Sequence, residues 1–140
     1  MAQIFLVRTL AIAAGLLIPS SGFASGPFDG RWSVDLQCPP SSDGALPFSW
    51  RFGGLVQNGA LRAEHGQAGR AAYLLLSGRI SPAGDASLVA QGITGTKGYN
   101  VRGASAGVPY TYSVPAHFSG NSGEGYWVGV RRCEFSFARQ

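Results

Sequence analysis

Cysteine and histidine are the side chains in this chain that most readily hold a metal or take part in redox chemistry. The 140 residues contain two of each: Cys38, His65, His117 and Cys133. They show no paired C-x-x-C or H-x-x-x-H spacing, which zinc sites normally have. Two cysteines in an exported chain usually form one disulfide, because the compartments outside the cytoplasm are oxidising. The sequence therefore predicts a Cys38–Cys133 disulfide and no metal site.

Catalytic motifs are not evident. Serines are numerous, but no G-x-S-x-G segment selects one as a nucleophile beside a histidine. The chain has seven acidic residues, and most lie in expected turns (Asp29, Asp43, Asp85 and Glu124), so a facing pair of catalytic carboxylates is not expected. The glycine-rich segments lack the lysine of a phosphate-binding loop. We expect a non-enzymatic protein without a cofactor.

The charge pattern does not indicate a nucleic-acid-binding protein. The formal net charge is only +4, and the basic residues are scattered, with Arg131 and Arg132 the one adjacent pair after the N-terminal segment. A nucleic-acid footprint is normally clustered on one face or in one tail. We therefore expect no nucleic-acid partner.

The N-terminus has the pattern of an export signal. A short segment ending at Arg8 precedes an apolar run over residues 10–19, and Gly22 and Ala24 are the small residues that a signal peptidase recognises. The apolar run is shorter than the roughly 20 residues that span a bilayer. We expect a signal peptide over residues 1–24, a single mature domain over residues 25–140 without stable membrane insertion, and a periplasmic or secreted location.

The mature part shows the period-two alternation of apolar and polar residues that is typical of half-buried β-strands. In the first strand Trp32, Val34, Leu36 and Cys38 share one face. The expected strands are residues 31–38, 48–57, 61–65, 71–80, 86–93, 99–102, 110–118 and 125–137. Residues 103–109 form a small-residue loop, which is the best candidate for a mobile segment.

Asn58-Gly59 is the strongest hairpin signal, because both residues tolerate the positive φ values of a type I′ turn. A two-residue turn would pair Gln57 with Ala60 and Val56 with Leu61. It would also place His65 opposite Phe52, where we expect a histidine that is satisfied by its neighbours near the end of the sheet.

The segment 125–137 changes parity, because Tyr126, Val128 and Val130 are even whereas Cys133, Phe135 and Phe137 are odd. A β-bulge between residues 129 and 132 would bring both sets to one face. Alternatively, Trp127 and Gly129 face inward with Cys133, and the even residues form an exposed apolar stripe. In the strand before it, Pro115 indicates an edge or a bulge, since proline donates no ladder hydrogen bond.

Eight short strands and no credible helix predict an all-β domain. A disulfide between the first and last strands favours a closed up-and-down antiparallel barrel. A two-sheet β-sandwich is the alternative.

Four segments together resemble a group of small exported proteins of Gram-negative bacteria that has no assigned activity. They are residues 28–34 (FDGRWSV), Asn58-Gly59, residues 109–118 (PYTYSVPAHF) and residues 132–137 (RCEFSF). In addition, Gly30-Arg31-Trp32 resembles the G-x-W that opens the first strand of lipocalin-like and avidin-like barrels. This second resemblance implies a barrel, and no ligand-reading residue of those families can be placed here.

Two functions from different classes are compatible with these features. A barrel whose open end is lined by aromatic rings would bind a small apolar or aromatic ligand. The candidate rings are Trp32, Trp50, Tyr110, Tyr112 and Trp127, which could instead simply fill the core. The alternative is an envelope interaction protein, or an inhibitor of a protease or lysozyme, by analogy with other small disulfide-linked barrels.

Overall fold

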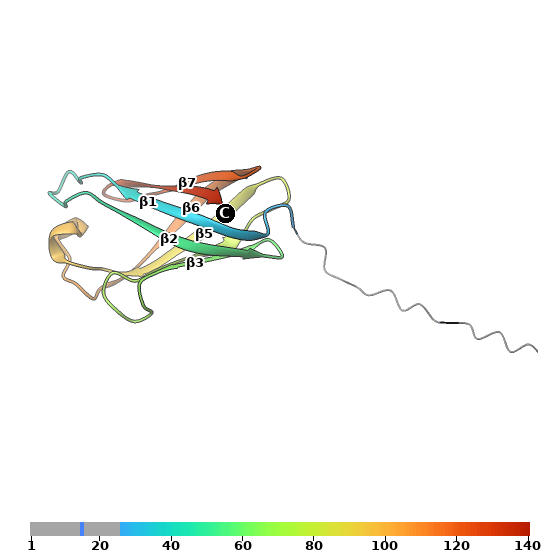
Figure 1. The fold of residues 1–140 in the computed structure, drawn as a ribbon. Helices are drawn as coiled ribbons and strands as arrows, with labels where there is room; N and C mark the ends of the chain where they lie inside the picture. The colour runs from blue at the N-terminus through green and yellow to red at the C-terminus, as the bar shows by residue number, and fades with distance from the viewer. Residues whose placement is uncertain (1–14, 16–25) are drawn as a thin grey trace, which may run out of the picture.

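The computed structural model describes residues 15 and 26–140, and these residues include a closed barrel of eight antiparallel strands in sequence order (Figure 1). The strands are β1 (Gly30–Cys38), β2 (Phe48–Gln57), β3 (Ala60–His65), β4 (Leu74–Arg79), β5 (Asp85–Ile93), β6 (Pro109–Ser119), β7 (Ser122–Val128) and β8 (Arg132–Arg139). Two 3-10 turns, η1 (Lys97–Tyr99) and η2 (Val101–Gly103), lie between β5 and β6. The predicted signal peptide lies outside the described residues, apart from Gly15.

Alternating side chains build the core. In β1 the inward residues Trp32, Val34 and Leu36 are fully buried, and in β8 Cys133, Phe135 and Phe137 are buried in the same alternating way. Apolar residues of all eight strands join one cluster, and removing this apolar area from water is the main favourable term in folding. The prediction of inward Trp32, Val34, Leu36 and Cys38 is confirmed.

The first and last strands close the barrel. β1 pairs with β8 from Trp32–Arg139 to Gln37–Glu134, and the Cys38–Cys133 disulfide lies at the end of this seam with its Cα atoms 4.3 Å apart. The predicted disulfide and the closed all-β barrel are confirmed, and the sandwich alternative is wrong. We call the end of the barrel at the disulfide the open end and the opposite end the closed end.

The β2–β3 hairpin has the predicted turn. Asn58 and Gly59 have φ values of 51° and 78°, as a type I′ turn requires. Gln57 pairs with Ala60 and Val56 with Leu61, so the predicted register is confirmed.

Two of the predicted strands are wrong. One is absent and the other is split into two, so the total of eight strands is still correct. Residues 99–102 do not form a strand: Tyr99 ends η1, Asn100 links the two turns, and Val101 and Arg102 belong to η2, where Arg102 has a φ of 57°. Residues 125–137 are not one strand but the ends of a hairpin, in which Trp127 of β7 faces Cys133 of β8. The turn between them is closed by a hydrogen bond from the Gly129 amide to the Arg131 carbonyl oxygen (3.2 Å).

This hairpin explains the parity change in residues 125–137. Trp127 is 5% exposed whereas Val128 is 65% exposed, so Trp127 faces inward and the β-bulge interpretation is wrong. The alternative is right for Tyr126 and Val128, which lie on the outer face. It is wrong for Val130, which follows the end of β7 and borders a cavity instead.

The seam between β6 and β7 is short. β6 pairs with β5 along nine positions, including Pro115 with Ser87, but its pairing with β7 begins only at Ala116. Pro115 therefore lies where the ladder to β7 has stopped, as expected for proline. At the open end the two strands are not paired, and aromatic side chains occupy this part of the barrel.

The closed end is filled. Trp32 packs edge-on against Phe118 (ring centroids 5.3 Å apart), and Phe118 also contacts Phe28 and Phe137. The indole Nε1 of Trp32 donates a hydrogen bond to the Phe28 carbonyl oxygen (2.8 Å). Arg139 lies over the Trp32 ring, 4.8 Å from its centroid, and donates to the carbonyl oxygens of Asp29 and Pro27 at 2.7 Å. Within residues 15 and 26–140, no helix is long and apolar enough to cross a membrane.

Candidate functional site

A cavity of about 440 Å³ lies at the open end, between the barrel wall and the segment that joins β5 to β6. We call this segment, residues 94–108, the cover loop; its 3-10 turns project beyond the strands at one end of the barrel (Figure 1). The lining is rich in aromatic and aliphatic side chains: Phe48, Trp50, Ile93, Tyr99, Val101, Val108, Pro109, Tyr110, Tyr112, Trp127 and Val130. This size and composition are those of small-molecule sites, which often lie in the mouths of β-barrels.

One wall of the cavity is a cluster of three aromatic rings, two of which are stacked. Tyr112 of β6 lies parallel to Trp127 of β7, with ring centroids 4.8 Å apart, and Tyr110 meets Trp127 edge-on at 6.2 Å. Gly92 of β5 pairs with Tyr110, and a Cβ atom at Gly92 would overlap the Tyr110 ring. The glycine therefore makes room for this tyrosine to lie against β5.

The facing wall comes from β2, and His65 of β3 supports it from behind. Trp50 stacks on His65 with ring centroids 3.9 Å apart and planes within 5° of parallel. The His65 Nδ1 is 2.9 Å from the Ala72 carbonyl oxygen, and Phe52 meets the imidazole edge-on. His65 is therefore held by its neighbours near the end of β3, and it positions Trp50 without bordering the cavity itself.

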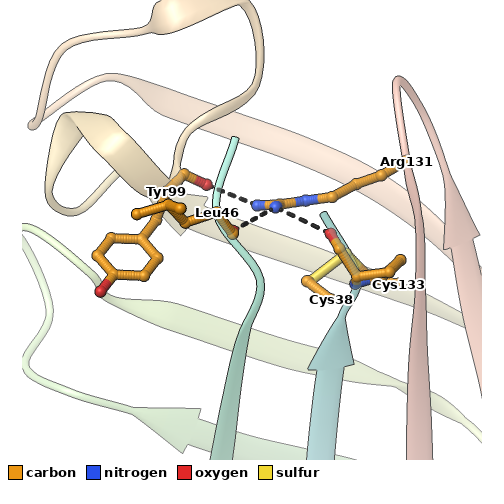
Figure 2. Close-up of a disulfide and its surroundings, with 6 residues drawn as sticks. Cys38, Leu46, Tyr99, Arg131 and Cys133 are labelled. Carbon is orange, nitrogen blue, oxygen red and sulfur yellow. Dashed lines mark hydrogen bonds between the residues drawn. A yellow bond between two sulfur atoms is a disulfide. The ribbon is translucent and has the colours of Figure 1, made fainter. Parts of the chain in front are cut away.

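Arg131 joins three segments at the open end (Figure 2). Its guanidinium donates hydrogen bonds to the carbonyl oxygens of Pro39 (3.2 Å), Leu46 (2.9 Å) and Tyr99 (2.6 Å). It also lies 5.0 Å from the centroid of the Phe48 ring, within the range of cation–π contacts. The β7–β8 turn, the β1–β2 loop and the cover loop thus meet at one side chain beside the disulfide.

Further hydrogen bonds stabilise the conformation of the cover loop and connect it to the β1–β2 loop. The Asn100 side-chain amide donates to the carbonyl oxygens of Gly95 and Ala104. The Arg102 amide donates to the Asp43 carboxylate (2.6 Å) and the Leu46 amide to the Gly98 carbonyl oxygen (2.9 Å). A hydrogen bond from Ser41, followed by that from the Arg102 amide, lowers the pKa of Asp43. The cover loop is therefore held in a defined conformation over the cavity by its own hydrogen bonds and by those to the β1–β2 loop.

Burial shifts the pKa of two groups that line the cavity. It raises the pKa of Tyr110 to about 12, with a smaller contribution from Tyr112 and an opposing one from Arg131. Burial also lowers the pKa of Arg131. At neutral pH Tyr110 is therefore a neutral phenol that can donate a hydrogen bond, and Arg131 remains a cation because its ordinary pKa is far higher.

The structure brings together four of the five aromatic residues that the sequence singled out. Trp50, Tyr110, Tyr112 and Trp127 all border the cavity. Trp32 does not, because it is completely buried at the closed end; we therefore remove it from the candidate site.

The site residues predicted from the sequence did not include Phe48, Arg131 or the cover loop, of which residues 103–108 were expected only as part of a mobile loop. Phe48 shares the inward parity of Trp50 and could have been included. Arg131 gave no such signal, because its role depends on three carbonyl groups from segments far apart in the chain.

Within residues 15 and 26–140, no group of three or more His, Cys, Asp or Glu side chains could hold a metal ion. Comparisons of the chain with protein-family models, curated proteins and solved structures found no match. The geometry of the cavity is therefore the basis for inferring function.

Proposed function

We propose that this protein binds one small ligand with an apolar or aromatic body in the cavity at the open end. The observation that carries the proposal is the contrast within the barrel: aromatic rings fill the closed end, whereas at the open end they stack along two walls and leave a space between them. Rings of a bound molecule would find flat partners there, and aromatic pairs contribute free energy beyond the area they bury.

The location proposed for this function is the periplasm or the exterior. The disulfide is consistent with an oxidising compartment, and the predicted signal peptide supports export. Intact-mass measurement of protein purified from the periplasm and the medium tests this. We expect a chain that begins at Ser25 or just after Gly26, and a full-length chain beginning at Met1 in those fractions would contradict it.

The binding proposal can be tested with N-phenyl-1-naphthylamine, a neutral aromatic probe whose fluorescence rises in apolar surroundings. We expect saturable binding at one site and a change in tryptophan emission. Trp50→Ala should weaken binding because it removes one wall of the cavity.

A cavity-filling pair provides a sharper comparison. Ala104 borders the cavity, whereas Ala106 of the same loop is exposed and does not. Ala104→Trp should weaken probe binding by at least about tenfold, which corresponds to about 1.4 kcal/mol. Ala106→Trp should bind like the original protein. If the probe shows no saturable site, or if both variants bind equally well, the proposal is wrong and the interaction-protein alternative becomes the better hypothesis.

A further inference from the structure

Taking the proposed binding function as the starting point, we propose that the natural ligand carries one anionic group next to its apolar or aromatic body. Arg102 and Arg131 would receive that group. The proposal rests on the distribution of charge around the cavity and on the hydrogen-bonding state of the two arginines.

All charged residues that line the cavity are basic. Arg102 and Arg131 line it, whereas no aspartate or glutamate does. Neither arginine forms a salt bridge with any residue in the described part of the chain. A concave site with one sign of charge and apolar walls concentrates ions of the opposite sign.

The positive charge of Arg131 is not neutralised by the groups to which its guanidinium donates hydrogen bonds. Carbonyl oxygens accept three of its hydrogen bonds but bring no net negative charge, and a guanidinium has five N–H donors. Removing a charge from water is costly unless an opposite charge accompanies it. The lowered pKa of Arg131, caused mainly by burial, agrees with this picture.

The Asp43 carboxylate does not neutralise Arg131 within the cavity. Asp43 acts on Arg131 at a distance, but its oxygens accept hydrogen bonds from the Ser41 hydroxyl and the Arg102 amide. It does not line the cavity.

Tyrosine hydroxyl groups add neutral donors to the same site. Tyr110 and Tyr112 both line the cavity, and a phenolic hydroxyl group can donate one hydrogen bond. A carboxylate or sulfonate would thus meet two cationic guanidinium groups and phenolic donors, while its ring would stack between the aromatic walls. Hydrogen bonds that involve ionised groups are about twice as strong as neutral ones.

Two nearly isosteric compounds test the charge. 2-Naphthoate is anionic and 2-naphthamide is neutral, and both can be titrated against the protein with N-phenyl-1-naphthylamine already bound. We expect naphthoate to displace the probe at a concentration about tenfold lower than naphthamide. Added salt should weaken naphthoate binding and leave naphthamide binding almost unchanged.

Variants assign the preference to the arginines. Arg102→Gln should reduce the ratio between the two compounds by several fold. Arg31→Gln is the matched control, because Arg31 is an exposed residue at the opposite end of β1; it should leave the ratio unchanged. Arg131→Lys keeps the charge and should retain most of the preference.

The failures of the two proposals are distinguishable. Equal displacement by both compounds, or no displacement by either, would overturn the anionic-ligand inference while probe binding left the proposed function intact. Unchanged selectivity in Arg102→Gln together with Arg131→Gln would overturn the assignment of the arginines. Absence of any probe site would contradict the proposed function itself.

Discussion

The two ends of the barrel share one kind of contact, an arginine over an aromatic ring, but they differ in how densely they are packed. At each end an arginine lies over an aromatic ring and donates to backbone carbonyl groups. Arg139, the last residue of β8, lies over Trp32 at the closed end, and Arg131, just before β8, lies over Phe48 at the open end. At the closed end Trp32 is fully buried and packs edge-on against Phe118. At the open end Phe48 is half-buried and borders an empty space.

Loop length and ring placement account for this difference. The closed end has two-residue hairpin turns after β2 and β6, whereas the open end has the 15-residue cover loop. Short turns bring core residues together, and long loops over a stable scaffold are where binding sites usually form. The comparison indicates that the closed end stabilises the barrel, whereas the open end is packed less densely and contains the candidate site.

Breaking the disulfide should have the largest effect. In the chain-entropy model, a link between residues 95 positions apart contributes about 4–5 kcal/mol to the free energy of unfolding. Because the disulfide lies at the open end, reduction should increase hydrogen exchange at the Leu46 amide more than at the Gly59 amide of the closed end. Thermal unfolding and exchange measurements check both points. Free thiols in the native protein, or loss of protection at the closed end alone, would contradict the account.

Truncating one tryptophan at each end tests the comparison directly. Trp32→Ala should lower the free energy of unfolding by about 3–5 kcal/mol, the usual cost of removing a fully buried large aromatic ring. Trp50→Ala should cost less, about 1–2 kcal/mol, because its ring is only partly buried and packs on His65 and Phe48 beside the cavity. Denaturant unfolding measures both values. Equal costs would show that the two ends are packed alike.

Replacing Arg139 or Arg131 should lower the free energy of unfolding by similar amounts, but should loosen opposite ends of the barrel. Arg139→Gln and Arg131→Gln each lose charge-assisted hydrogen bonds to backbone carbonyl groups, which contribute about 1.5–3 kcal/mol in typical cases. For Arg131→Gln we expect faster hydrogen exchange at the Leu46 amide, and for Arg139→Gln at the Gly59 amide. Local exchange that does not follow this division would mean that the ends are not independent.

A single methyl group should disturb the aromatic wall. Gly92→Ala would overlap the Tyr110 ring, and such overpacking costs about 1–3 kcal/mol. The near-ultraviolet circular dichroism of the stacked rings should change as well. Gly98→Ala is the control, because its added Cβ would meet only a Leu46 side-chain atom at 3.7 Å. Equal effects of the two substitutions would contradict the role of Gly92.

A pH-dependent effect should appear in alkaline solution. The pKa of Tyr110 is raised to about 12 in the folded protein, against about 10 in an unfolded chain. Between these values the unfolded state releases the phenolic proton first, so the free energy of unfolding should fall as pH rises from about 10 to about 12. Tyr110→Phe should show a shallower fall. An identical pH dependence in both proteins would contradict the burial of this hydroxyl group.

The sequence predicted the barrel because its main signals were local. The alternation around Trp32, the Asn58-Gly59 turn and the presence of only two cysteines each depend on near neighbours or on simple counting. Residues 125–137 were harder, because a three-residue turn at Gly129 leaves a hydrophobic pattern that also fits one long strand. Residues 99–102 look extended by composition, and the 3-10 turns there depend on contacts with Asp43 and Arg131.

The aromatic composition of the candidate site was predictable, but its geometry was not. Inward parity identified Trp32 and Trp50 equally well, and parity does not say at which end of a closed barrel a ring leaves free space. Distinguishing them requires the register around the whole barrel and the length of the loops at each end.

A crystal structure of the protein with bound N-phenyl-1-naphthylamine tests the central claim most directly. The account predicts the probe between the Trp50 wall and the Tyr112–Trp127 wall, under the cover loop, with no probe beside Trp32. A cavity filled by an inward shift of residues 101–104, or a probe bound only on the outer face of the barrel, would contradict it.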